Sequence, residues 1–112
     1  MKTKAAVQSL AALAQETRLS IYRALVQQGP SGLAAGALAE RLDVANATLS
    51  FHLKELVNAG LIVPRQDGRF IYYAANYDAM STLLEYLTAN CCAGEPCSAT
   101  SRTAPARRRT TA

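Results

Sequence analysis

The sequence has no apolar run of about 18 residues, the length that a membrane-spanning helix needs, so a transmembrane helix is excluded. It also lacks an acid–base pair or an activated nucleophile, and its only histidine, His52, has no serine or cysteine partner near a pocket. No enzyme, no organic cofactor and no membrane partner are therefore expected. Residues 1–19 only faintly resemble a secretory signal, because Gln8 and Ser9 interrupt the apolar stretch, so a cytoplasmic protein is predicted.

Net charge is missing from most of the chain. Of the 12 lysine and arginine residues, four lie in the last eleven positions, and the other eight are balanced by eight aspartate and glutamate residues. The formal charge of +4 therefore comes from the last eleven residues, and only the local placement of basic residues can argue for a nucleic-acid partner. The 112 residues predict one small domain over residues 1–92. Residues 93–112 are predicted to be a flexible tail that carries one cysteine and a basic cluster, whose contact with DNA stays open.

Apolar periodicity predicts four helices before a change of pattern. The first three are expected at residues 3–14, at Glu16–Gln28 and at Leu33–Leu42. Asn46 is expected to cap a fourth helix with an inward stripe of Leu49, Leu53, Leu56 and Val57, and Gly60 ends it. The runs 61–63 and 70–73 are β-branched or aromatic, and Asp67-Gly68 between them predicts a β-hairpin.

The fourth helix and the hairpin together have the layout of a winged helix-turn-helix, in which the helix enters the DNA major groove. The outward face of this helix carries Asn46, Thr48, Ser50, His52 and Lys54, and no acidic residue precedes Glu55. Such a face suits phosphates and base edges. A helix and a hairpin that only pack together are the alternative. Double-stranded operator DNA is the predicted partner.

A fifth helix is expected to start near Asn76 or Asp78, with an apolar stripe of Met80, Leu83, Leu84 and Leu87. The stripe either packs on its own domain or pairs with a second copy. A chain this small has a limited core, so a homodimer through the first and last helices is favoured. Dimers also suit DNA sites that consist of two symmetric half-sites.

The three cysteines fall within seven residues, at Cys91, Cys92 and Cys97. A structural disulfide is disfavoured by the odd number, and a closed zinc site by the lack of nearby histidine. A soft ion such as trivalent arsenic or antimony is satisfied by two or three thiolates. A redox switch, through a disulfide between Cys97 and one of the adjacent pair, competes with the metalloid site, and an inert tail is the third possibility.

The chain resembles the ArsR/SmtB family of small dimeric winged-helix repressors over residues 5 to about 90. The resemblance is carried by the segments 16–19 (ETRL), 38–42 (LAERL), 48–56 (TLSFHLKEL), 59–62 (AGLI), 68–69 (GR) and 71–73 (IYY). It implies a fold of five helices with the hairpin before the last one. It places Asn46, Ala47, Ser50 and Phe51 toward the groove, Thr48 and His52 beside them, and Arg69 on the wing. Lys54, Arg65 and Arg69 are expected to neutralise phosphates.

Two familiar sensor sites of that family are missing here. The third helix has no Cys-x-Cys pair, and the last helix offers only Asp78 and Glu85 and no histidine. The sequence is therefore interpreted as a repressor that binds its operator as the ligand-free dimer. Trivalent arsenic, inorganic or organic, or antimony is predicted to release it by binding the C-terminal cysteines. A thiol redox-sensing repressor is the alternative.

Overall fold

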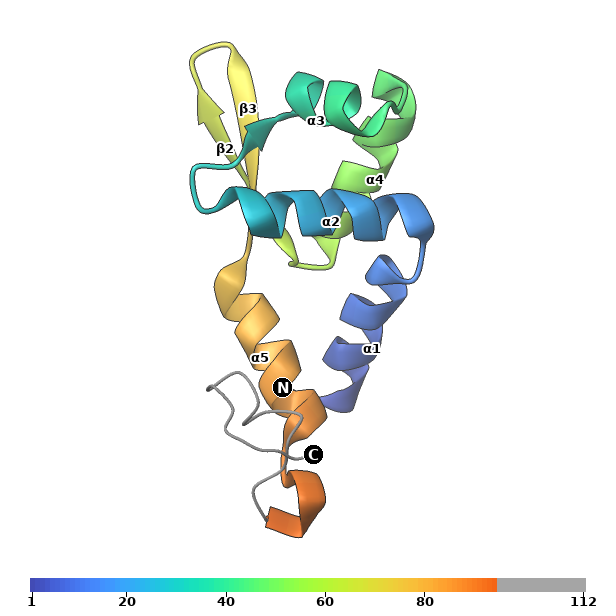
Figure 1. The fold of residues 1–112 in the computed structure, drawn as a ribbon, viewed down its shortest axis with the longest axis vertical. Helices are drawn as coiled ribbons and strands as arrows, with labels where there is room; N and C mark the ends of the chain where they lie inside the picture. The colour runs from blue at the N-terminus through green and yellow to red at the C-terminus, as the bar shows by residue number, and fades with distance from the viewer. Residues whose placement is uncertain (95–112) are drawn as a thin grey trace, which may run out of the picture.

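The computed structural model describes residues 1–94, which contain five α-helices, one short 3-10 helix and three strands. In chain order they are α1 (Thr3–Leu13), α2 (Glu16–Gln28), β1 (Leu33–Ala34), α3 (Ala35–Leu42), α4 (Asn46–Asn58), β2 (Ile62–Asp67), β3 (Phe70–Ala75), α5 (Tyr77–Thr88) and the 3-10 helix η1 (Cys91–Gly94). The hairpin β2–β3 projects at one end, and α1 and α5 extend from the other (Figure 1). The predicted mainly helical fold with a wing is confirmed.

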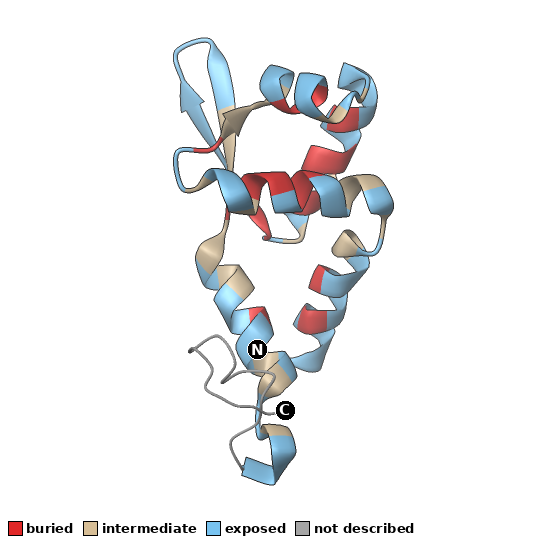
Figure 2. Cartoon of the chain, in the orientation of Figure 1, coloured by how far each residue is buried: buried red, intermediate tan, exposed pale blue. Residues whose placement is uncertain are grey.

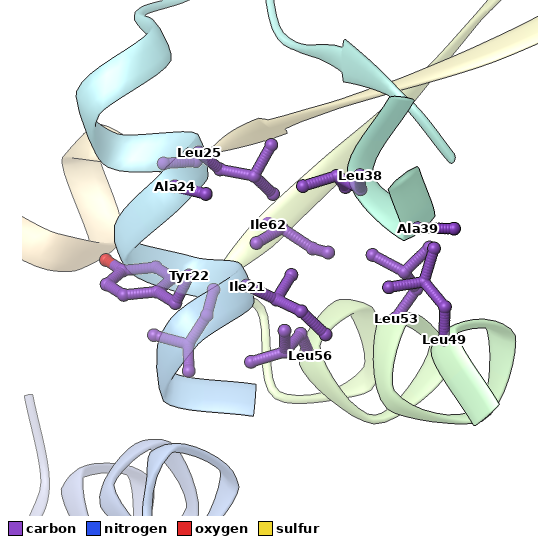
Figure 3. Close-up of a cluster of buried hydrophobic side chains, with 12 residues drawn as sticks. Ile21, Tyr22, Ala24, Leu25, Leu38, Ala39, Leu49, Leu53, Leu56 and Ile62 are labelled. Atoms are coloured by element: carbon purple, nitrogen blue, oxygen red, sulfur yellow. The ribbon is translucent and has the colours of Figure 1, made fainter. Parts of the chain in front are cut away.

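The core lies where α2, α3, α4 and the base of the wing meet (Figure 3). Leu49, Leu53 and Leu56 recur at helical spacing on α4 and are at most 2% exposed, as their periodicity predicted. Ile21 and Leu25 of α2 are fully buried against them. Burying each of these aliphatic side chains contributes about 1.5–3 kcal/mol, so α4 is held mainly by its inner face.

The sheet has three antiparallel strands in the order β1-β3-β2. The predicted hairpin is confirmed: Asp67 pairs with Phe70 across a two-residue turn. Strand β1 corrects the sequence analysis, which placed residues 33 and 34 at the start of a helix. Pairing of Leu33 with Tyr73 outweighs the helical propensity of this leucine- and alanine-rich stretch.

Gly32 makes β1 possible. It has φ +76°, and a Cβ atom there would lie 2.5 Å from the carbonyl oxygen of Tyr73. Only glycine lets the two backbones approach so closely.

Local turns set the direction of α4. After its last turn, the Gly60 N–H donates to the Val57 carbonyl at 2.9 Å and the Leu61 N–H to the Leu56 carbonyl at 3.1 Å. These two bonds form a Schellman motif, which the glycine at φ +77° permits. The start of α4 differs from the prediction. Ala45 occupies the capping position without a side-chain bond, and Asn46 is the first helical residue, so the expected cap is wrong.

Helix α5 is fixed to the core at its first turn. The Asn76 side chain accepts from the Ala79 N–H at 3.1 Å, as predicted for a cap, and donates to the Gly60 carbonyl at 3.0 Å. The Tyr77 hydroxyl donates to the Val26 carbonyl at 2.8 Å. Beyond this turn α5 runs out beside α1, and much of both helices is exposed (Figure 2). None of the helices in residues 1–94 is long and apolar enough to cross a lipid bilayer.

Candidate nucleic-acid interface and thiol pair

The outward side of α4 carries a continuous strip of exposed side chains, which we call the reading face. Its members are spaced at i, i+1, i+4, i+5 and i+8, so they share one side of the helix. They are Asn46, Ala47, Ser50, Phe51 and Lys54, all exposed and all predicted. Thr48 is also exposed, at the flank of this strip.

The chemistry of the reading face suits DNA. No acidic residue occurs from Asn46 to Lys54, and Glu55 is only half-exposed. Amide and hydroxyl groups such as those of Asn46 and Ser50 can bond base edges, and an apolar ring can contact the thymine methyl group. Phe51 is 58% exposed although it is a large hydrophobic residue, so it contributes little to the core.

His52 lies in α4 but not on its reading face. Its side chain is only 8% exposed, and its Nδ1 atom lies 3.3 Å from Nη1 of Arg18. The structure therefore gives no support to the prediction that His52 flanks the groove-facing residues. Sequence reasoning also missed this partner, because Arg18 is 34 positions away and only the tertiary fold brings the two together.

The wing carries two predicted arginines with different surroundings. Arg65 donates from Nη2 to the Ser31 carbonyl at 2.8 Å, lies 3.7 Å from the Asp67 carboxylate, and has its guanidinium 5.0 Å from the centre of the Tyr72 ring. Arg69 occupies the hairpin tip, and within residues 1–94 its side chain has no hydrogen bond or ion pair. Both are exposed, but only the charge of Arg69 is unshared.

Two of the three cysteines lie in the described part of the chain. Cys91 and Cys92 occupy η1, immediately beyond α5, with their sulfur atoms 3.6 Å apart. Cys91 is half-buried and Cys92 is exposed. Two sulfurs at this separation can both reach one ion at the sulfur–metal distance of about 2.3 Å seen for thiolate ligands. The pair therefore fits a thiophilic ion.

The third predicted ligand, Cys97, and the basic cluster lie outside the described residues. The predicted start of the tail, at residue 93, falls within η1 and stays a prediction. Within residues 1–94 no group of three or more cysteine, histidine or carboxylate side chains is placed to hold a metal ion.

The comparisons with known proteins agree with this architecture. Residues 13–65 match a family model described as a helix-turn-helix domain. The arsenical resistance operon repressor of Bacillus subtilis is 36% identical over 77 residues, which cover 69% of this chain and 71% of that protein. The structure of HlyU from Vibrio cholerae superposes with a TM-score of 0.62 at 33% identity and covers 78% of this chain and 97% of that one. The chain belongs to the ArsR/SmtB family.

A second solved structure extends the match along the chain. An ArsR-like transcriptional regulator from Rhodococcus superposes with a TM-score of 0.69 at 28% identity, covering 90% of this chain and 93% of that one. As an ArsR/SmtB-family protein, the chain is a winged-helix DNA-binding transcriptional regulator and not an enzyme. Two of the relatives are named for resistance to metal or metalloid ions: the Bacillus subtilis repressor for arsenicals, and CadC of Listeria innocua, 33% identical over 73 residues, for cadmium.

Proposed function

We propose that this ArsR/SmtB regulator is a repressor that binds operator DNA as a homodimer and leaves it when its C-terminal thiols capture trivalent arsenic or antimony. The observation that carries the proposal is the pair of sulfurs 3.6 Å apart at the end of α5. Arsenic and antimony in this oxidation state prefer sulfur ligands, and two thiolates from adjacent residues can hold one such ion without rearranging the helices. Similarity to the arsenical resistance operon repressor of Bacillus subtilis supports the same ligand class.

The reading face supplies the DNA contacts. Asn46 and Ser50 bond base edges in the major groove, Ala47 and Phe51 make apolar contacts there, and Thr48 contacts the groove wall. Lys54 and Arg69 neutralise phosphates. Arg65 contributes less, because its guanidinium is already shared among Ser31, Asp67 and Tyr72.

The two terminal helices form the homodimer. Four large aliphatic side chains on them are 42–57% exposed, which is unusual for a surface that stays in water. They are Val7 and Leu10 on α1 and Leu84 and Leu87 on α5. The hydroxyls of Thr3 and Tyr86 are hydrogen-bonded, so the two helices present this apolar surface together.

Replacing Leu87 by glutamate tests the dimer, because the new carboxylate would be buried in the seam. Thr82→Glu is the matched control, since Thr82 is exposed on the opposite side of α5. We expect Leu87→Glu to give monomers in sedimentation equilibrium and Thr82→Glu to stay dimeric. If both variants stay dimeric, the seam lies elsewhere.

Ligand binding reaches the DNA through α5. Cys91 follows the last residue of α5, Thr88, by three positions, so an ion held by the two sulfurs constrains the end of this helix. Because α5 lines the seam, its displacement changes the spacing of the two reading faces. A coupling of about 1–3 kcal/mol weakens operator binding roughly 5- to 150-fold, which is enough for a switch.

The test is an operator-binding titration with the reduced, full-length protein. Arsenite, an organic trivalent arsenical, zinc, cadmium and peroxide are added separately. We expect both arsenicals to release the wild-type dimer, and the double variant Cys91→Ser/Cys92→Ser to stay bound. Cys97→Ser is the matched single-thiol control. A sharp loss of the arsenite response in that variant indicates a three-thiol site, and a retained response indicates a two-thiol site. Normal release of the double variant by arsenicals would end the proposal.

A thiol redox switch is the second candidate, and the exposure of the Cys92 thiol favours it. HlyU of Vibrio cholerae, 32% identical to this chain in the matching structure, has been solved in a form described as reduced. Oxidation would join Cys91 or Cys92 to Cys97 as a disulfide, with peroxide as the electron acceptor. Release by peroxide but not by arsenicals selects this function.

A further inference from the structure

We propose that Arg18 and His52 form a positioning pair that sets the orientation of the reading face. Neither residue needs to touch DNA in this role. The inference rests on DNA binding by α4 and is independent of what the cysteines bind.

The first observation is the direction of the hydrogen bond between the two side chains. Arginine is always a donor, so the 3.3 Å contact makes Nδ1 of His52 the acceptor. In the neutral ring the hydrogen then lies on Nε2. Because His52 is only 8% exposed, the acceptor side of this part-buried bond has little contact with water.

The second observation is that the same guanidinium holds a third helix. Nε of Arg18 donates to the Ala12 carbonyl at 2.7 Å, and Ala12 lies in the last turn of α1, where carbonyls lack intrahelical partners. The backbone N–H of Arg18 is itself bonded by the Gln15 side chain at 2.8 Å, which fixes the first turn of α2. One side chain therefore joins the end of α1, the start of α2 and the middle of α4.

The third observation connects the pair to the reading face. The Phe51 ring meets the His52 ring edge-on, with centroids 5.4 Å apart and an interplanar angle of 64°. Leucine packing on the inner side of α4 is not directional, so it constrains the rotation of the helix less sharply than a hydrogen bond does. The directional bond from Arg18 to His52 restricts the rotation of α4. It also holds the His52 ring against the exposed Phe51 ring.

The test compares operator and non-specific duplex DNA in the full-length protein. His52→Leu removes the acceptor, Arg18→Met removes the donors, and His52→Gln keeps an oxygen that can accept from Arg18. We expect His52→Leu and Arg18→Met each to weaken operator binding about fivefold or more, with unchanged non-specific affinity and salt dependence. His52→Gln should retain most of the affinity. The double variant should be no weaker than the weaker single variant, because both remove the same bond.

Other outcomes overturn the pair. If His52→Leu loses affinity for only one base-pair position and Arg18→Met loses none, His52 contacts DNA directly. If both variants melt earlier but keep the wild-type ratio of operator to non-specific affinity, the bond is merely structural.

A second measurement does not depend on the stability of these variants. His52 is the only histidine, so nitrogen NMR of its ring is unambiguous. We expect the hydrogen of the neutral ring on Nε2, and a hydrogen on Nδ1 would refute the bond.

Discussion

The two wing arginines give the sharpest prediction about DNA binding, because their surroundings differ so clearly. Arg69 stands at the hairpin tip with an unshared charge, whereas Arg65 contacts the Ser31 carbonyl, the Asp67 carboxylate and the Tyr72 ring. Arg69→Ala should therefore remove one phosphate contact per protomer and leave the fold unchanged. Arg65→Ala should mainly weaken the wing.

The expected magnitudes follow from these contacts. Each phosphate contact contributes about 0.9 to the slope of log affinity against log salt, so Arg69→Ala in both protomers lowers the slope by about 1.8. When the salt concentration rises fourfold, the ratio of the variant's affinity to that of the wild type should therefore rise about tenfold. For Arg65→Ala, the ion pair with Asp67 counts little because the two side chains are 53% and 70% exposed. The cation–π contact and the bond to Ser31 together stabilise the fold by about 1 kcal/mol, or about 4–8 °C in melting temperature.

The assay is operator binding by anisotropy between low and moderate salt, with thermal unfolding of each variant alongside. Lys4→Ala is the charge-matched control, because α1 lies at the end of the molecule away from the wing (Figure 1). Its slope should equal that of the wild type. Equal slope changes for Arg65→Ala and Arg69→Ala would refute the reasoning. They would show that the contacts of Arg65 within the protein do not reduce its contribution to phosphate binding.

Three further predictions concern stability. Gly32→Ala should destabilise the fold by about 2–4 kcal/mol in a urea titration, because the new Cβ atom would collide with the Tyr73 carbonyl and the backbone has φ +76°. Gly36→Ala should instead stabilise the fold by up to about 1 kcal/mol, because no other atom lies near the new Cβ atom. Asn76→Ala should cost about 1–2 kcal/mol through the lost cap and the lost bond to Gly60, measured in the same titration. Burial, and then the nearby Tyr77, raise the pKa of Tyr22 above its usual 10.0. Above about pH 10 the unfolded chain therefore loses a proton that the folded chain keeps, so the free energy of unfolding falls as pH rises. Tyr22→Phe should make this fall shallower in urea titrations at increasing pH.

The parts of the fold that local chemistry determines could be predicted from the sequence. Helix α2 has the predicted bounds, Glu16–Gln28, because a periodic apolar stripe ends at Gly29-Pro30. Gly60 ends α4 and Asp67-Gly68 closes the hairpin for the same kind of reason, since each needs only a left-handed residue at one position. The exposed side of α4 was equally predictable once Leu49, Leu53 and Leu56 had fixed its inner side.

What the sequence could not give depends on partners that are far apart in the chain. Strand β1 forms because β3 offers it an edge, and nothing in the local Leu33-Ala34 stretch signals this. The position of His52 in the pattern of α4 predicts an exposed polar residue, but its side chain is buried and lies within hydrogen-bond distance of Arg18. Arg65 has the sequence context of a phosphate contact, and only the folded wing shows that it is engaged elsewhere.

Among the three residues predicted to contact phosphates, only Lys54 and Arg69 have unshared charges within residues 1–94, and this explains why the dimer is central to the proposed switch. In the proposed complex Lys54 and Arg69 would give about two phosphate contacts per protomer, so a dimer would make about four and a single protomer half of them. Because the last eleven residues alone carry the net charge of the chain, the rest of the protein would add little electrostatic attraction to a single bound reading face. The inducer therefore has no need to unfold either DNA-binding domain. A change in the seam that prevents both reading faces from engaging at once would remove half of the proposed phosphate contacts, and release requires a coupling of only about 1–3 kcal/mol.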